Sequence, residues 1–447
     1  MRTLRAETVF LLLALVFGTG FLVLTPPFQV PDEAFHLFRS WEISQGHLEE
    51  KTEAGQTSKE VPKSLVDFLS SFLHLLYQPR EKTSAEEILA FRHKSLAPED
   101  TQSYAFVSTS PHPSLPYLPQ TIAMATGKAL QLSPFSLFYW GRLLNFILWL
   151  LLVYNAVRII PLFRWVLTVL ALSPMSLHQA ASLSPDAMAN GLAFLLTALL
   201  LRLVLKDSEA PASKNIVGAA VISLCLTISK LVYLGHALLF LGIPRRKFSS
   251  AAAYFWSLGA VFAAHALAVW LLLHGEHFAS RPETQFQSQW ILHHPHGYLE
   301  LLAKTFRVQA WLYIRQCIGI FGHLDTPLPR PLTLFYLVFL AFVVWRDRGE
   351  VRNLRGWERA SLLGIALLEI LAILSSIFIT WTKPGASIVL GVQGRYFIPV
   401  LPLLLLPLYR PNRTGSEMER DCLPYFCLYG TATILTVSLF VLKNRFY

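Results

Sequence analysis

The chain has 447 residues, of which 53% are apolar (AVILMFWYC) and only 15% are charged. A soluble protein of this length would need more charge to cover two or three domain surfaces, so a set of soluble domains is excluded. Four cysteines are too few for a disulfide scaffold. The net charge of +10 comes from short Lys/Arg clusters between apolar runs, which is typical of membrane topology and not of nucleic-acid binding. We therefore predict a membrane protein that binds no nucleic acid.

A helix crosses the hydrocarbon core of a bilayer in about 20 residues. The apolar segments predict an all-α polytopic bundle of about eleven transmembrane helices, and the two short ones within 215–243 could be drawn differently. The first segment follows Arg2 and Arg5 as a signal peptide would, but it lacks an A-x-A cleavage site and is predicted to be retained. The segments are 7–25, 137–157, 163–180, 187–205, 215–229, 231–243, 250–273, 332–345, 360–381, 395–409 and 423–442.

Basic residues mark the predicted orientation. Short Lys/Arg clusters occupy every second connection, which predicts that the N-terminus is cytoplasmic and the C-terminus outside. The whole chain, residues 1–447, then forms one membrane domain with two long outer loops, 26–136 and 274–331. The first loop is long enough to carry structure of its own. We expect an amphipathic helix at 33–46, a second helix at 62–77, a proline-broken stretch at 108–119 and an interfacial helix at 298–320.

Five polar motifs fall on the outer side of this topology, where an ionisable residue at the membrane edge is costly and usually functional. Asp32, His36 and Arg39 are spaced to share one helix face, although Asp32 with Glu33 would also suit a simple helix N-terminus. The other four motifs contain Asp186, Lys230, Asp325 and the run Gln393-Gly394-Arg395-Tyr396.

Each of these motifs has a simpler structural interpretation. Asp186 could cap a helix, Lys230 could extend from a helix end to the interface, and Arg395 could be an interfacial anchor. Gly394, however, places a small residue beside the planar cation of Arg395, which suits the close approach of a phosphate. The histidines at 293, 294 and 296 lack helical ligand spacing, so no metal site is predicted there.

These residue types favour one chemistry. A carboxylate outside the membrane can act as general base towards a hydroxyl, and cations around it can neutralise a phosphate leaving group. Together they point to the transfer of a sugar from a lipid-phosphate donor to a hydroxyl acceptor. A polymerase or ligase that consumes a pyrophosphate-linked glycan, and a lipid or polysaccharide transporter, remain as alternatives; the transporter would more often show an internal repeat, and none is seen.

The motifs PPFQVPDEAFHLFR, LSPMSLHQAASLSPDAMANGL, SKLVY, GHLDTPLP and GVQGRYFIP, in this order over residues 7–409, resemble the bacterial membrane family catalogued as domain of unknown function 2142. This family is grouped with the glycosyltransferases of the C-type fold (GT-C). The resemblance implies a GT-C-like bundle in the bacterial inner membrane, a polyprenyl-phosphate sugar donor, a glycan or glycolipid acceptor and an inverting mechanism on the extracytoplasmic face.

Carried over position by position, the resemblance implies that Asp32 is the catalytic base and Glu33 its neighbour. Lys230 and Arg395 are then phosphate ligands, and Asp186 is a second polar residue of the site. We place His36, Arg39, Asp325, Gln393 and Tyr396 among the substrate-binding residues as well. The chain lacks the D-x-D motif of oligosaccharyltransferases, so no metal ligand is assigned and the need for a divalent cation stays open. The sugar, the acceptor and the oligomeric state are not specified by the sequence.

Overall fold

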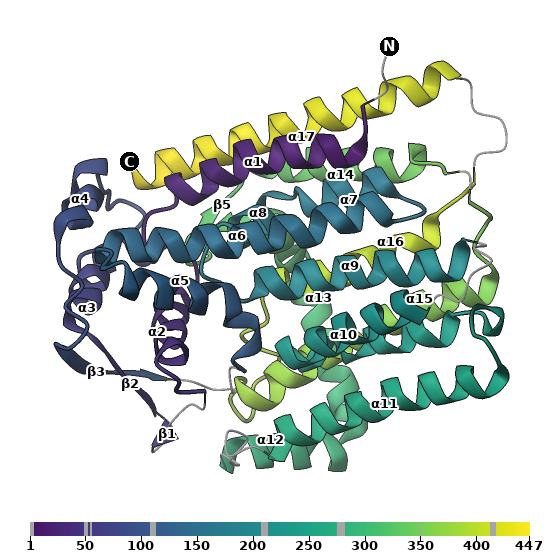
Figure 1. Cartoon of the computed structure of the whole chain (residues 1–447), viewed down its shortest axis with the longest axis horizontal. Coiled ribbons are helices and arrows are strands. Elements are labelled where there is room, and N and C mark those ends of the chain that lie inside the picture. Colours follow the sequence, from purple (N-terminus) through teal and green to yellow (C-terminus); the bar gives the residue numbers. More distant parts are fainter. Residues whose placement is uncertain are drawn as a thin grey trace.

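The computed structural model describes residues 4–48, 52–53, 56–107, 113–206, 213–274, 282–349, 351–411 and 417–447. Its long helices lie side by side in one bundle, and a smaller helical and stranded layer covers one end (Figure 1). Within these described ranges, six helices are long and apolar enough to cross a membrane, which confirms a polytopic membrane protein. They are α1 (Ala6–Leu24), α6 (Pro134–Ile159), α9 (Asp186–Leu205), α11 (Ala251–His274), α15 (Gly356–Thr380) and α17 (Glu417–Phe446).

The remaining predicted spans are also helical, but they are shorter or interrupted. The expected single helix over 163–180 is wrong: it is divided into α7 (Arg164–Ala171) and α8 (Pro174–Ala180). Pro174 has no N–H to continue the first helix, and the Ser173 side chain caps the second. The others are α10 (Ser213–Ser229), the 3-10 helix η4 (Leu231–Gly242), α14 (Arg330–Arg346), and the consecutive short helices η7 (Gly394–Val400), α16 (Leu401–Leu405) and η8 (Leu406–Leu408).

The first long loop contains strands as well as helices, so the all-α prediction is wrong for this part of the chain. Strands β1 (Thr52–Glu53), β2 (Gln56–Pro62) and β3 (Thr101–Val107) form an antiparallel sheet, in which Pro62 pairs with Thr101 and Gln56 with Val107. Neither long strand shows a clean alternation of apolar and polar residues, and so the pattern did not reveal them. The helices here are α2 (Glu33–Ser44), α3 (Lys63–Ser70), η1 (Leu73–Leu75), α4 (Ala85–Leu89), η2 (Ala90–His93), η3 (Leu115–Tyr117) and α5 (Leu118–Ala129).

Helix α2 confirms the helix expected near 33–46, but not its amphipathic character. Every residue from Phe35 to Ile43 is buried, including His36 and Arg39. The expected helix at 62–77 is present only in part, as α3 and η1. Within the expected proline-broken stretch, residues 108–112 lie outside the described residues, and the rest leads into η3 and α5. The protein therefore surrounds α2, and its polar side chains face other protein groups.

The second long connection carries α12 (Pro282–His293) and α13 (Pro295–Gly319), which contains the helix expected at 298–320. A short strand pair, β4 (Ile320–Phe321) and β5 (Thr326–Pro327), follows it, and the short helix η5 (Arg245–Lys247) lies between η4 and α11. The start of this connection, at 275–281, is outside the described residues.

The C-terminal end of α17 lies against the first long loop. The Thr83 N–H donates to the Phe446 carbonyl over 2.8 Å, and Arg445 donates to the carbonyls of Glu81 and Leu75. In Figure 1 the C-terminus lies beside α4, whereas α1 begins towards the opposite end of α17. The start of α1 and the end of α17 thus lie towards opposite ends of the bundle. We call the end that carries residues 26–133 the loop face.

Cysteine labelling checks this arrangement. In a variant whose native cysteines are replaced, Glu86→Cys and Lys443→Cys should react with a membrane-impermeant thiol reagent added outside intact cells, because both positions are exposed at the loop face. Arg348→Cys, which follows α14 in a basic connection, should react only after the cells are opened. Labelling of Arg348→Cys alone from outside would reverse the predicted orientation, and opposite results for the two loop-face positions would contradict the fold.

Candidate functional site

Four charged residues from distant parts of the chain meet at the loop face. We call Asp32, Asp186, Lys230 and Arg395 the charged cluster. Arg395 Nη2 donates to Asp32 Oδ2 over 3.1 Å, and Lys230 Nζ donates to Asp186 Oδ1 over 2.6 Å. Arg395 Nε lies 3.9 Å from Asp186 Oδ2, which joins the two pairs. The structure thus brings together four of the residues that the sequence predicted for one site.

Asp32 holds the most accessible charge of this cluster. It precedes α2 with a left-handed backbone (φ +65°), a conformation that Asp tolerates better than most residues. Its side chain is 60% exposed, while that of Arg395 is only 4% exposed. The Asp32 side chain makes no capping hydrogen bond to α2, although its backbone carbonyl accepts from the His36 N–H. Capping therefore does not account for Asp32, whose carboxylate faces outward over a buried cation.

Asp186 is also more than a helix cap. It is the first residue of α9, after Pro185, and the Gln179 side chain donates to its Oδ2 over 3.1 Å while Lys230 donates to its Oδ1. Gln179 is itself held by Asn190, one turn into α9. These contacts orient the Asp186 carboxylate between the two cations of the charged cluster.

Arg395 is buried with unused donors. Among the described residues, neither its Nε nor its Nη1 has a hydrogen-bond partner. The Oε1 atom of Gln393 and both ring nitrogens of His178 are likewise buried without one. The ring of Tyr396 is shared by two cations, with Lys230 Nζ 4.5 Å and the Arg395 guanidinium carbon 5.5 Å from its centre. Buried polar groups are normally satisfied, so these donors and acceptors suit a polar ligand.

Glu33 points away from the charged cluster into a fully buried ion pair. Arg142, on α6, donates to both Glu33 oxygens, over 2.9 and 2.7 Å, and neither side chain is exposed. The same guanidinium binds the carbonyls of Leu22, Thr25 and Pro26, and the Leu183 N–H donates to Glu33. This contact fastens the end of α1 and the start of α2 to α6, and it fixes the backbone on which Asp32 stands. Arg142 was not among the residues predicted from the sequence, although a single arginine inside an apolar run indicates a functional or structural partner.

Arg142→Ala should lower the free energy of unfolding by about 3–5 kcal/mol, because it leaves the Glu33 charge buried without a partner. Thermal unfolding of the purified protein in detergent measures this change. Arg352→Ala is the matched control: its pair with Glu358 is also bidentate, but the Arg352 side chain is 38% exposed, so a loss of at most about 1 kcal/mol is expected. Equal losses of unfolding free energy in the two variants would contradict the structural role of Arg142.

His36 and Arg39, which the sequence places on one helix face with Asp32, form hydrogen bonds to other parts of the loop face. His36 Nδ1 is 2.8 Å from the Tyr117 hydroxyl, and Arg39 donates to the carbonyls of His47 and Leu48. These bonds join α2 to η3 and to the loop that directly follows α2. Asp32 itself accepts a hydrogen bond from Arg395, which lies 363 residues further along the chain.

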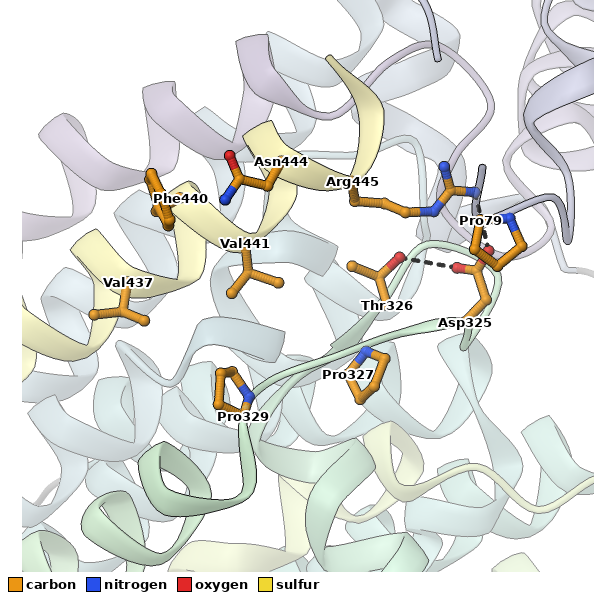
Figure 2. A pocket seen from close by; sticks show the side chains of 10 residues that line it. All are labelled: Pro79, Asp325, Thr326, Pro327, Pro329, Val437, Phe440, Val441, Asn444 and Arg445. Atoms are coloured by element: carbon orange, nitrogen blue, oxygen red, sulfur yellow. Dashed lines mark hydrogen bonds and ion pairs between the residues drawn. The ribbon is translucent and has the colours of Figure 1, made fainter. Parts of the chain in front are cut away.

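Asp325 belongs to a different group of residues. Its Oδ2 accepts from Arg445 over 3.2 Å and its Oδ1 from the Thr326 hydroxyl over 3.0 Å. Figure 2 shows both contacts at one edge of a groove of about 620 Å³. The groove lies between the end of α17, with Val437, Phe440 and Val441, and the segment after β4. The structure thus separates Asp325 from the charged cluster, although both lie at the loop face.

Gly394 is required by helix packing. Its N–H donates to Gln316 Oε1 over 2.7 Å, and the Cys317 thiol donates to its carbonyl. A Cβ atom at this position would lie 2.0 Å from the Tyr313 carbonyl oxygen. The close approach that the sequence analysis reserved for a phosphate is therefore made by the backbone of α13, and it places the next residue, Arg395.

Gly394→Ala should destabilise the protein and displace Arg395, because the clash is with backbone atoms that cannot rotate away. We expect a loss of about 1–3 kcal/mol in the free energy of unfolding, from thermal or denaturant unfolding in detergent. Gly364→Ala on α15 is the control, since nothing lies within 4 Å of its added Cβ atom; in a helix interior it should be neutral or stabilising. A Gly394→Ala protein as stable as wild type would contradict the packing described here.

Among the described residues, no group of three or more His, Cys, Asp or Glu side chains is arranged to hold a metal ion. The model of one family, described as "Predicted membrane protein (DUF2142)", matches residues 15–404. Neither the curated proteins nor the solved structures contain a match to this chain. The matched region contains all four residues of the charged cluster and the Glu33–Arg142 pair.

Proposed function

The chain is a member of this family of predicted membrane proteins, and from its charged cluster we propose that it is a glycosyltransferase that uses a lipid-linked donor. In this proposal it moves a sugar from a polyprenyl-phosphate carrier to a hydroxyl of a glycan or glycolipid acceptor. The observation that carries the proposal is an exposed carboxylate, Asp32, held directly above a buried arginine with unused donors, Arg395. In this proposal the base and the phosphate ligand are the neighbouring side chains of Asp32 and Arg395.

Arg395 and Lys230 are the ligands for the donor phosphate. Arg395 offers Nε and Nη1, which have no hydrogen-bond partner among the described residues, and its planar fork suits phosphate oxygens. Lys230 is 31% exposed and adds a second positive charge. As the bond from sugar to phosphate breaks, negative charge develops on the phosphate, and two fixed cations stabilise it.

Asp32 acts as general base in a single displacement. Its carboxylate accepts the proton of the acceptor hydroxyl, the hydroxyl oxygen forms a bond to the anomeric carbon, and the bond from that carbon to the phosphate oxygen breaks. The electron pair leaves with the phosphate, and the configuration at the anomeric carbon inverts. Asp32 can meet a water-borne acceptor because its side chain is exposed.

We place the loop face outside the cytoplasmic membrane of a bacterium, in a GT-C-like arrangement. Basic connections at the opposite end of the bundle support this orientation, since Lys and Arg favour the cytoplasmic side. A polymerase or ligase acting on a pyrophosphate-linked glycan would use the same cations, and a transporter would use them without breaking a covalent bond.

The experiment is sugar transfer by the purified protein from synthetic polyprenyl-phosphate and polyprenyl-pyrophosphate sugars to added glycan or glycolipid acceptors, followed by mass spectrometry and by NMR of the product. The proposal expects a free polyprenyl phosphate and a glycosylated acceptor of inverted anomeric configuration. Transfer from only the pyrophosphate-linked donor would favour the polymerase or ligase. Movement of intact donor between the leaflets of a vesicle, with no bond broken, would favour the transporter and overturn the proposal.

A further inference from the structure

A buried histidine, six positions further along the chain than Lys230, meets a buried glutamate inside the bundle. His236, on η4, and Glu369, on α15, are both completely buried, with 2.6 Å between His236 Nδ1 and Glu369 Oε1. The sequence analysis did not single out either residue. Buried ionisable groups inside a membrane bundle are costly, and they persist where they serve a purpose. We infer that His236 and Glu369 are positioning residues that hold η4 so that Lys230 reaches the charged cluster; this rests on the proposed role of Lys230 as a phosphate ligand.

Three side chains at three-residue intervals fasten the start of η4 to three different elements. Lys230, which immediately precedes the helix, donates to Asp186 on α9. The Tyr233 hydroxyl donates to the Tyr396 carbonyl on η7 over 2.8 Å. His236 pairs with Glu369 on α15. The last of these contacts is the deepest along the helix, and the first belongs to the proposed site.

The conformation of η4 needs such support. The non-helical backbone of Tyr233 divides η4, and the residues on either side are in 3-10 conformation, whose runs beyond three or four residues are uncommon because their hydrogen bonds are poorer. Glu369 also packs against the backbone of η4, since a Cβ atom on Gly235 would lie 2.8 Å from Glu369 Cγ. One glutamate therefore contacts both the backbone and the imidazole of η4 and holds it against α15.

The geometry links this contact to Lys230. Lys230 lies six positions before His236. A 3-10 helix rises about 2.0 Å per residue and an α-helix about 1.5 Å, so relaxation of this stretch, which includes the non-helical Tyr233, towards α geometry would shift Lys230 by up to about 3 Å. A shift of this size would break the 2.6 Å contact of Lys230 with Asp186. Loss of the buried pair should therefore be felt in the charged cluster.

Two measurements on Glu369→Gln test the inference. The first is acylation of the Lys230 amine by a water-soluble reagent, followed by peptide mass spectrometry; we expect labelling to rise at least threefold as Lys230 leaves Asp186. The second is the affinity for a polyprenyl phosphate in detergent, which should fall about tenfold in the wild-type background and by less than twofold in a Lys230→Met background. Ser223→Ala is the control. Ser223, on α10, is the side-chain partner of another buried imidazole, that of His265 on α11. Both measurements on this variant should stay within twofold of wild type.

Unchanged Lys230 labelling in Glu369→Gln would overturn the inference, and so would equal losses of affinity in the two backgrounds. If Glu369→Gln does not give folded protein, Glu369→Asp, which keeps the charge and shortens the side chain, is measured under the same criteria. A wild-type protein that binds no polyprenyl phosphate would contradict the proposed function alone, because the labelling measurement still decides the role of the buried pair.

Discussion

Asp32→Asn should reduce sugar transfer by a factor of about 100 to 10,000 and leave donor-lipid binding within about twofold of wild type. The size of the loss is that of a missing general base. Asparagine has nearly the same shape, can adopt the left-handed backbone of this position, and can still accept a hydrogen bond from Arg395. The rate of transfer and the affinity for the donor lipid are measured on the same purified variant, together with its melting temperature.

Glu33→Gln is the contrasting variant. The family resemblance implies that Glu33 is the neighbour of the catalytic base. The structure predicts that the change acts through stability, because Arg142 would be left as a buried charge without its carboxylate. A near wild-type rate in Asp32→Asn would mean that the base lies elsewhere. Asp186 would then be the next candidate, because Asp325 is paired with Arg445 outside the charged cluster.

Arg395→Ala should weaken binding of the donor lipid by about tenfold or more, since a charge-assisted contact contributes about 1.5–3 kcal/mol. Arg395→Lys should fall between this variant and wild type, because an ammonium keeps the charge but not the two fixed donors Nε and Nη1. The measurement is a titration with a polyprenyl phosphate in detergent.

Arg445→Ala is the matched control for this experiment. Arg445 is also a buried arginine at the loop face that pairs with an aspartate, and its side chain is 6% exposed. Its removal should lower the melting temperature but leave donor affinity unchanged. Loss of donor affinity in both variants would show that Arg395 acts through folding. Unchanged donor affinity in a folded Arg395→Ala protein would show that Arg395 is not a phosphate ligand.

Much of the fold follows from hydropathy, because each apolar segment must satisfy its own backbone hydrogen bonds in lipid and so becomes helical. The break at Ser173-Pro174 and the sheet at β2 and β3 did not follow in this way. The break depends on Pro174, which cannot continue α7, and on the Ser173 side chain, which caps α8. The sheet depends on pairing between strands about forty residues apart, which leaves no period in either strand.

The sequence by itself determined that the chain spans a membrane and which polar motifs lie at the same end as Asp32, because hydropathy fixes depth and the order of crossings fixes the side. Only the tertiary structure decided which charges meet. It pairs Asp32 with Arg395, Glu33 with Arg142 and Asp325 with Arg445, and it buries His236 with Glu369. The order of residues determines how deep each side chain lies along its helix. Which side chain it meets across the bundle depends on how the helices are rotated and packed, and therefore on contacts between segments hundreds of residues apart.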